Sequence, residues 1–151
     1  MLSPQEISDR LEIQELLVRY SHAVDTRDWD ALAQVFTPDA TIDYTAFGGI
    51  RGDFTSIRAF LKASMPHFSS YQHLITNIVL EINGSEARGR TACLNPMVID
   101  RGDGSEPHVF FCGLWYRDRL VRTAQGWRIA DRCQERSYIF NTPPEMQPAT
   151  A

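Results

Sequence analysis

The chain has 151 residues, 43% of them hydrophobic and 23% charged, and a formal net charge of −4. This composition is typical of a single globular domain with a sizeable core. No run of about 18 apolar residues is present to cross a membrane. Lys62 is the only lysine and the basic residues form no cluster, which argues against nucleic-acid binding. The polar N-terminus lacks the apolar segment of a secretory signal, so we expect a cytoplasmic protein.

Two helices are predicted at the N-terminus. The residues SPQE, Ser3 to Glu6, have the form of a capping box with proline at the first helical position. Apolar residues then recur at helical spacing and predict a helix of about twenty residues, which DTRD interrupts. Asp28 can cap a second, short helix over residues 29–36, which ends before Pro38.

A short strand and a third helix follow. The sequence ATIDYTA predicts a strand over residues 40–46, and a glycine-bearing loop comes next. Asp53 or Thr55 can cap a third helix over residues 56–65, which Pro66 stops. The loop lacks the G-x-x-x-x-G-K pattern, so it does not predict a nucleotide site.

From residue 71 onward the hydrophobic period changes from helical to alternating, which indicates strands. The turn signals NGS, RGDGSEP and TAQG predict a meander of four antiparallel strands over residues 71–82, 86–100, 108–122 and 127–140. Helices segregated from a meander indicate an α+β fold. We expect a single domain over residues 1–141, with a Pro-rich tail over residues 142–151. In this domain a cone-shaped, curved antiparallel sheet is covered by three N-terminal helices and leaves a ligand cavity at its wider end.

Motifs for metals and cofactors are absent from the sequence. Cys93, Cys112 and Cys133 lie roughly twenty residues apart with no C-x-x-C spacing, which argues against a zinc site or a disulfide framework. The four histidines are at no metal-ligand spacing from one another, and no nucleophile elbow occurs. We expect no metal and no organic cofactor, and we interpret the cysteines as small apolar strand residues.

Candidate catalytic residues are scattered along the chain. Asp25 stands at the end of the first helix, where the helix dipole disfavours a carboxylate, so it is either a surface charge or a functional group. Tyr20 shares the apolar face of that helix, whereas His22 is expected to be exposed. Beside a carboxylate, His73 would be a base held in one tautomer. Alternation places it on one strand face with Ile75, Asn77 and Val79.

Further polar and aromatic residues can complete such a site. Tyr44 can donate a hydrogen bond, and Arg136 can supply a fixed positive charge. Three more residues with ring side chains can line the cavity, namely His108, Trp115 and Tyr138. Each of these residues, taken alone, also fits a purely structural role.

The stretch YSHAVDTRDWDALAQVFTPDATIDY, residues 20–44, resembles the opening of the SnoaL-like branch of the nuclear-transport-factor-2-like superfamily. It is most similar to the scytalone dehydratases and the bile-acid 7α-dehydratases, with the hexachlorocyclohexane dehydrochlorinase as a further relative. The similarity continues through YQHLITNIVLEINGSEARGRT and GLWYRDRLVRTAQGWRIADR, so it covers nearly the whole chain. It implies a cone-shaped fold in which Asp25 and His73 form a catalytic dyad facing the cavity.

The resemblance also implies roles for three other residues. Tyr44 falls where scytalone dehydratases have a substrate-binding tyrosine. Tyr20 and Arg136 fall where bile-acid dehydratases have a tyrosine and an arginine. Tyr20 also stands where the dehydrochlorinase has a lysine, so chloride elimination is not expected.

The polar groups on the substrate side of the predicted cavity differ from those of the scytalone dehydratases. Met97 replaces their second pocket histidine, and Phe110 and Cys112 fall near their serine and asparagine. Scytalone itself is therefore not the expected substrate.

The resemblance predicts a cofactor-independent lyase of the dehydratase type, with a small, mostly apolar substrate. Asp25 would orient His73, His73 would abstract a proton, and water would leave a hydroxy-ketone of aromatic or polycyclic character. One alternative is a non-catalytic small-ligand-binding or accessory module of the same fold. A further alternative is an isomerase, a polyketide cyclase or an epoxide hydrolase. The same resemblance predicts a homo-oligomer, with a trimer favoured and a dimer possible.

Overall fold

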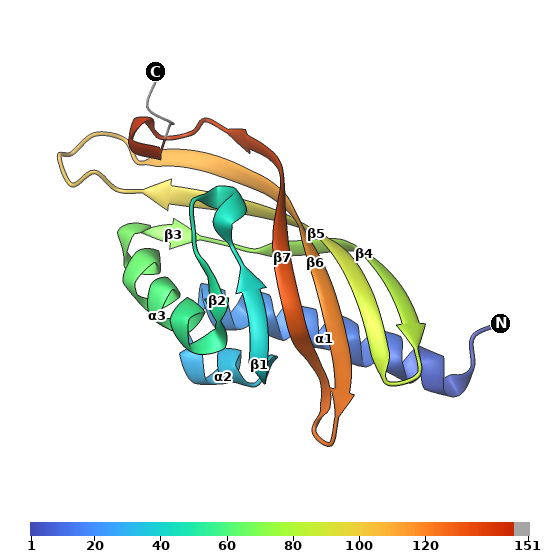
Figure 1. Cartoon of the computed structure of the whole chain (residues 1–151). Coiled ribbons are helices and arrows are strands. Elements are labelled where there is room, and N and C mark those ends of the chain that lie inside the picture. The colour runs from blue at the N-terminus through green and yellow to red at the C-terminus, as the bar shows by residue number, and fades with distance from the viewer. Residues whose placement is uncertain (147–151) are drawn as a thin grey trace.

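The computed structural model describes residues 1–146, in which three helices precede most of a seven-stranded sheet (Figure 1). Residues 147–151, the end of the predicted tail, lie outside the described residues. The helices are α1 (Pro4–Asp25), α2 (Trp29–Ala33) and α3 (Phe54–Ser64). The strands are β1 (Phe36–Asp43), β2 (Arg51–Asp53), β3 (Ser70–Tyr71), β4 (Leu74–Asn83), β5 (Glu86–Ile99), β6 (His108–Thr123) and β7 (Gly126–Phe140).

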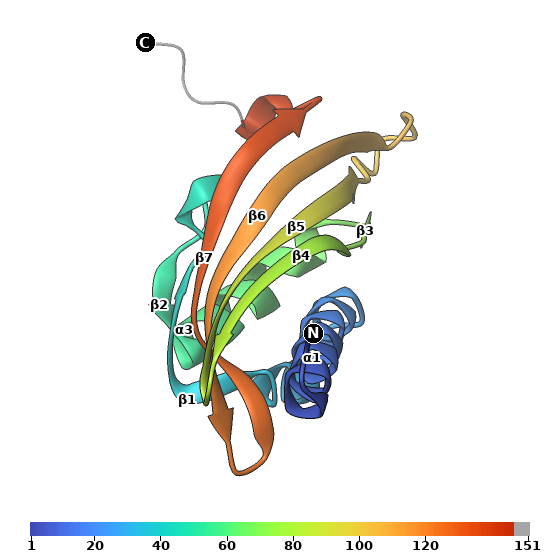
Figure 2. The same ribbon diagram turned by 90° about the vertical axis from the view of Figure 1, so that its right-hand side faces the viewer.

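The sheet has the strand order β2-β1-β7-β6-β5-β3, and β4 also pairs with β5. Figure 2 shows the sheet curving over α1 and α3, which lie on its concave side. The expected α+β fold and the four-stranded meander, β4 to β7, are confirmed. The sheet is not wholly antiparallel, however, because β1 pairs in parallel with β7. Order along the sequence does not show which meander strand the N-terminal strand joins.

The first helix begins as the sequence predicts. The Ser3 hydroxyl accepts the Glu6 N–H at 3.2 Å, and the Glu6 carboxylate accepts the Ser3 N–H at 2.7 Å. This reciprocal pairing satisfies two of the N–H groups that a helix start leaves without partners. The helix then buries one face against the sheet, including Ile13, Leu16 and Tyr20. Its last residue is Asp25, so the rigid helix fixes where that carboxylate lies.

The predicted boundary between the second helix and the first strand was wrong. Helix α2 ends at Ala33, and β1 already begins at Phe36 rather than at residue 40. Pro38 lies inside the strand, where the register with β7 shifts between Phe36 and Thr41. Because proline has no N–H to donate, a strand tolerates it at an irregularity of this kind.

The strand predicted over residues 71–82 is broken in the structure. β3 ends at Tyr71 and β4 starts at Leu74, so His73 lies in the gap between two strands. Asn77 has a positive φ of 45° at a bulge, which reverses the alternation beyond it. Val79 is consequently 63% exposed. The expectation that His73, Asn77 and Val79 share one strand face was therefore wrong.

Candidate active site

A cavity of about 290 Å³ lies between the concave face of the sheet, the end of α1 and helix α3. Aromatic and aliphatic side chains form most of its wall, including Phe60, Phe68 and Leu114. The polar groups that reach it include Tyr20, Tyr44, His73 and Asn95. A concave, mostly apolar site with a few convergent polar groups is the usual form of a small-molecule site.

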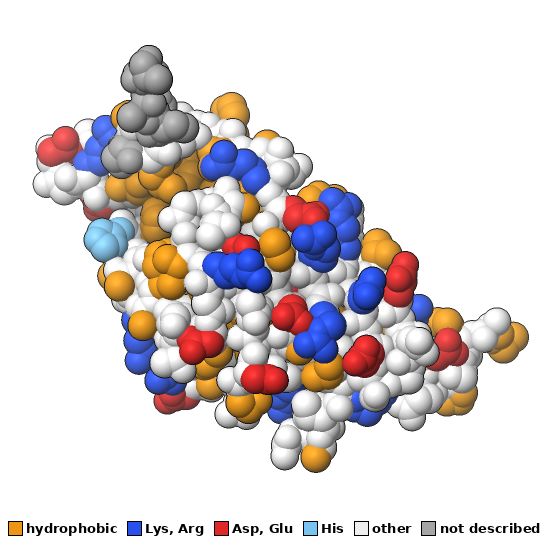
Figure 3. Space-filling model, in the orientation of Figure 1, with side chains coloured by type: hydrophobic (Ala, Val, Ile, Leu, Met, Phe, Trp, Pro, Cys, Tyr) orange, Lys and Arg blue, Asp and Glu red, His pale blue; other side chains and the backbone are white. Residues whose placement is uncertain are grey.

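A larger hollow of about 710 Å³ lies on the opposite, outer face of the sheet, and it contains none of the five predicted site residues. Its wall is charged and includes Arg88, Arg117 and Asp131. Figure 3 shows Arg or Lys and Asp or Glu side chains interspersed over β6 and β7 on this face. Exposed pairs such as Arg119 with Asp131 occupy it, so we interpret it as a solvated surface and place the site in the smaller cavity.

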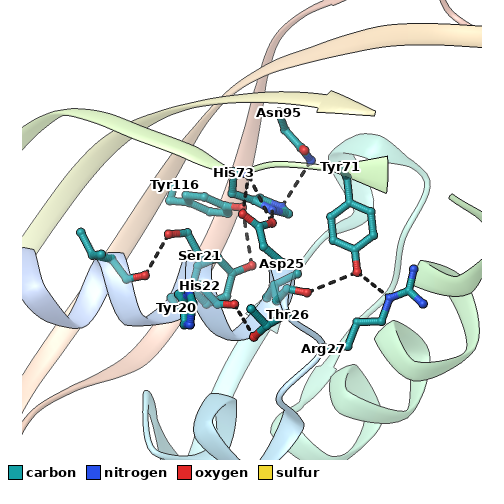
Figure 4. A network of polar contacts seen from close by, with 12 residues as sticks. Tyr20, Ser21, His22, Asp25, Thr26, Arg27, Tyr71, His73, Asn95 and Tyr116 are labelled. Carbon is teal, nitrogen blue, oxygen red and sulfur yellow. Dashed lines mark hydrogen bonds and ion pairs between the residues drawn. The ribbon is translucent and has the colours of Figure 1, made fainter. Parts of the chain in front are cut away.

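Asp25 and His73 meet at the edge of the cavity (Figure 4). His73 Nδ1 lies 2.6 Å from Asp25 Oδ1. The side chain of His73 is 6% exposed and that of Asp25 is 21% exposed. The His73 backbone N–H also donates to both carboxylate oxygens, at 3.0 and 3.2 Å. A carboxylate is an acceptor only, so Nδ1 carries the proton and Nε2 of the neutral ring is the basic atom. The structure thus brings together the two residues of the predicted dyad.

A clamp behind the dyad holds its two elements in place. Arg27 follows α1 with a positive φ of 58°, and its Nε donates to the Tyr71 hydroxyl at 3.0 Å. Its Nη2 lies 3.3 Å from the Phe68 carbonyl oxygen, and the Tyr71 hydroxyl donates to the Val24 carbonyl at 3.3 Å. Figure 4 shows the contact between Arg27 and Tyr71 beside Asp25. They join the end of α1 to the segment that leads into His73.

Three tyrosines form a hydrogen-bonded cluster on the other side of the histidine ring. The Tyr20 hydroxyl is 2.7 Å from that of Tyr44 and 3.5 Å from that of Tyr116. The Tyr20 and His73 rings meet edge to face with centroids 6.4 Å apart. Burial, together with the neighbouring Tyr20 hydroxyl, raises the pKa of Tyr44 and of Tyr116 well above the ordinary value. Both hydroxyls therefore keep their protons and remain hydrogen-bond donors.

A buried ion pair that sequence reasoning missed supports the tyrosines. The Arg132 guanidinium lies 4.1 Å from the ring centroids of both Tyr20 and Tyr116. It donates two hydrogen bonds to Asp118, at 2.8 and 2.7 Å, and both side chains are fully buried. Burial alone would lower the pKa of Arg132, but the Asp118 carboxylate raises it well above the ordinary value. A permanent positive charge therefore lies beneath the tyrosine rings.

The other predicted residues lie outside the cavity wall. Arg136 is exposed, with its guanidinium 5.2 Å from the centroid of the Phe47 ring at the rim. Tyr138 is half exposed and covers Gly113, while Trp115 lies under Arg90. The prediction that His108, Trp115 and Tyr138 line the cavity was wrong, because Trp115 and Tyr138 point to the outer face and His108 bonds the Asn141 carbonyl at 2.8 Å.

Asn95 is a second site residue that the sequence did not reveal. It is 7% exposed, lines the cavity from β5, and places Nδ2 3.3 Å from His73 Nε2 (Figure 4). Nearby Cys112 also lines the cavity, but burial raises the pKa of its thiol to about 11. The thiol is therefore protonated and is not a nucleophile at neutral pH.

Within residues 1–146, no group of three or more His, Cys, Asp or Glu side chains is arranged to hold a metal ion. No helix in this part of the chain is both long and apolar enough to span a membrane.

The fold and the cavity together define a cone-shaped α+β domain with a histidine–carboxylate pair inside it. Residues 5–133 match the SnoaL-like domain, and the chain belongs to that family. The resemblance found in the sequence is thereby confirmed. A Mycobacterium tuberculosis relative, the uncharacterized protein Rv2910c, is 49% identical over 138 residues, which cover 91% of this chain and 92% of the relative.

Solved structures show the same fold. A candidate aromatic ring hydroxylase from Novosphingobium aromaticivorans has 27% identity and a TM-score of 0.82, with 97% and 100% of the two chains covered. A candidate scytalone dehydratase from the same organism has 17% identity and a TM-score of 0.78, with 91% and 89% covered. The hexachlorocyclohexane dehydrochlorinase LinA-type3 of Novosphingobium barchaimii has 18% identity and a TM-score of 0.77, with 91% and 92% covered. At this identity the last two show a shared fold alone.

Proposed function

We propose that the protein is a cofactor-independent lyase that removes water from a small hydroxy-ketone of aromatic or polycyclic character. The observation that carries this proposal is the 2.6 Å contact between Asp25 and His73 Nδ1 beside a cavity that His73 lines. The contact fixes the tautomer in which Nε2 is basic, and it stabilises the imidazolium that forms when Nε2 takes a proton.

The reaction would begin with proton transfer. His73 Nε2 takes a proton from the carbon next to the ketone, and the electrons of that C–H bond move into an enolate. Tyr20 or Tyr44 donates a hydrogen bond to the enolate oxygen, as fixed donors in a water-poor site do. The bond from the neighbouring carbon to its hydroxyl then breaks, and the hydroxyl leaves as water with the proton from Nε2. Arg132 does not touch the substrate in this scheme; it positions Tyr20.

The size and wall of the cavity support the proposed substrate class. A volume of about 290 Å³ is enough for a small ring compound and too small for a large polymer. Aromatic side chains such as Phe47, Phe60 and Phe68 suit an aromatic or alicyclic ring. Two proteins of the same fold, the candidate scytalone dehydratase and the dehydrochlorinase, are named as enzymes of elimination, so the proposed reaction is compatible with this fold.

The test uses small aromatic β-hydroxy-ketones, beginning with the racemic aldol of benzaldehyde and acetone. Its dehydration product, benzalacetone, is followed by ultraviolet absorbance. Exchange of the protons next to the carbonyl of benzylacetone, which has no hydroxyl to lose, is followed in D2O by NMR. We expect His73→Ala to reduce both rates by about 10²–10⁴-fold. The matched control is His22→Ala, which removes an exposed histidine on α1, outside the cavity wall, and should leave both rates unchanged.

Each outcome distinguishes one reading of the site. Retention of both rates by His73→Ala would exclude His73 as the base. Exchange without elimination in the wild-type protein would favour an isomerase or a cyclase. Binding without either reaction would favour a non-catalytic ligand-binding module.

We also propose that the protein self-associates through the outer face of the sheet, as a trimer or a dimer. Val109, Tyr138 and Phe140 are 39%, 50% and 64% exposed near one end of that face. Burying such apolar surface would be favourable. Sedimentation equilibrium should show an oligomer for the wild-type protein and a smaller species for Phe140→Asp. A monomeric wild-type protein would contradict this proposal.

A further inference from the structure

The side-chain amide of Asn95 has one satisfied and one unsatisfied end. Its Nδ2 lies 3.3 Å from His73 Nε2, whereas its Oδ1 is buried without a hydrogen-bond partner. Five buried side-chain atoms in the described part of the chain have no partner, and Oδ1 is the one that belongs to a residue lining this cavity. Buried acceptors are nearly always paired, so an unpaired one in a ligand cavity requires an explanation.

The orientation of the amide follows from the dyad. Asp25 accepts the Nδ1 proton of His73, so Nε2 of the neutral ring has a lone pair and no hydrogen. Only the NH2 end of the Asn95 amide can pair with that lone pair. The carbonyl end must then point away from Nε2, because two lone pairs cannot face each other. The unpaired Oδ1 is therefore a consequence of the His73 tautomer.

No described residue, including the cavity-lining Ser64 and Gln134, donates a hydrogen bond to this oxygen. The Tyr20 and Tyr44 hydroxyls pair with each other at 2.7 Å. Met97, two residues along the same strand, and Cys112, opposite Asn95 on β6, present sulfur to the cavity. The missing partner therefore comes from outside the chain, as a water molecule or as a donor on a bound ligand that replaces it.

We propose that Asn95 Oδ1 is the binding point for the hydroxyl group of the ligand, and that it selects hydroxy-ketones over ketones that lack the hydroxyl. The inference rests on the proposed function for the class of ligand. Asn95 touches the substrate in this scheme and is a specificity-determining residue. Its role differs from that of the tyrosines, which meet the ketone oxygen.

This placement also suits the elimination. When the substrate hydroxyl donates its hydrogen to Oδ1, the lone pairs of the hydroxyl oxygen remain free to accept a proton. The Nε2 atom that removed the carbon-bound proton lies next to the same amide. The carbon–oxygen bond breaks as Nε2–H protonates that oxygen, so the proton taken from carbon leaves in water. The long Nδ2···Nε2 contact is weak and is readily exchanged for the substrate.

The test measures binding without turnover. The ligand is a racemic β-hydroxy-ketone derived from benzaldehyde in which both hydrogens between the ketone and the carbinol are replaced by methyl groups. It cannot lose water by proton abstraction at that carbon, and its deoxy counterpart is the matched ligand. Dissociation constants are measured by NMR titration for the wild-type protein and for Asn95→Leu, Asn95→Asp and Met97→Leu.

We expect the wild-type protein to bind the hydroxyl-bearing ligand about tenfold more tightly than the deoxy ligand, which is one neutral hydrogen bond. Asn95→Leu, close in size to asparagine, should abolish this preference. Asn95→Asp keeps an acceptor and should retain it, and it serves as the readout if the leucine variant does not fold. Met97→Leu alters the same wall without touching a hydrogen bond, so it should change both affinities alike.

The inference is overturned if the wild-type protein shows no preference for the hydroxyl, including the case in which neither ligand binds. It is also overturned if Asn95→Leu retains the preference, since a group other than Oδ1 would then bind the ligand hydroxyl. The wild-type protein could prefer the hydroxyl-bearing ligand yet catalyse neither proton exchange nor the elimination of water. That result would support this inference and reject the proposed function. The two failures are therefore distinguishable.

Discussion

Removing the negative charge of Asp118 should destabilise the protein strongly. Asp118→Asn keeps the shape of the side chain but replaces one of its two oxygens with an NH2 group. Arg132 donates a hydrogen bond to each oxygen of Asp118, so one of these two bonds is lost in the variant. Both partners are fully buried, and the bonds are 2.8 and 2.7 Å long. The Arg132 cation would remain buried between two tyrosine rings without its counter-charge. Breaking a buried ion pair in this way costs about 3–5 kcal/mol.

The cost is measured as a change in thermal unfolding temperature. A domain of 150–250 residues loses about 2–4 °C per kcal/mol, so Tm should fall by about 6–20 °C. The matched control is Asp131→Asn on the same pair of strands. Asp131 also pairs with an arginine, Arg119, but both side chains are 47% exposed, so its loss should cost no more than about 1 kcal/mol. Equal shifts for the two variants would refute the reasoning, because burial would then not matter.

Three further predictions concern the dyad, its clamp and the far end of α1. Two-bond proton–nitrogen NMR spectra should show the Nδ1–H tautomer for neutral His73, and a mixed or Nε2–H form in Asp25→Asn; an unchanged tautomer would show that Asp25 does not select it. Arg27→Gly suits the positive φ of 58° but removes the clamp, so urea titration should show a loss of about 1.5–3 kcal/mol, and no loss would reject a role for its hydrogen bonds. Burial would raise the pKa of Asp9, but hydrogen bonds from Arg122, Gln5 and Trp127 together lower it below the ordinary 3.8. Asp9 therefore stabilises the fold above this pH, the contribution disappears as the pH falls through the folded value, and Asp9→Asn should remove this part of the acid dependence of Tm.

The sequence predicted those features that depend on local chemistry. The Ser3 capping box, the Asp28 cap of α2 and the Asp53 cap of α3 are all present, because each needs only a side chain and a nearby backbone N–H. The meander followed from hairpin signals and alternation. The pairing of Asp25 with His73 came from the resemblance, since 48 residues separate them and no local rule joins them.

Two features that the sequence did not predict, the inward position of Arg132 and the exposure of Val79, lie beyond irregularities in the strands. One register shift in the pairing of β7 with β6 falls between Ile129 and Asp131, and beyond it Arg132 points inward beneath Tyr20. Strict alternation from Trp127 would have turned Arg132 outward. The same effect at Asn77 exposes Val79. A bulge depends on the tertiary fit of two strands, so a period of two along one strand does not reveal it.

The dyad combines two local features that are each unfavourable alone. A carboxylate at the C-terminal end of α1 opposes the helix dipole, and a break between β3 and β4 leaves a backbone N–H without a strand partner. In the structure the free N–H of His73 donates to Asp25, and the ring N–H donates to the same carboxylate. Each feature therefore compensates for the other. A chain selected for stability alone has simpler solutions at both positions, and local rules are broken in this way where a site must be built. The break between β3 and β4, which the sequence did not predict, therefore also orients His73, the proposed base.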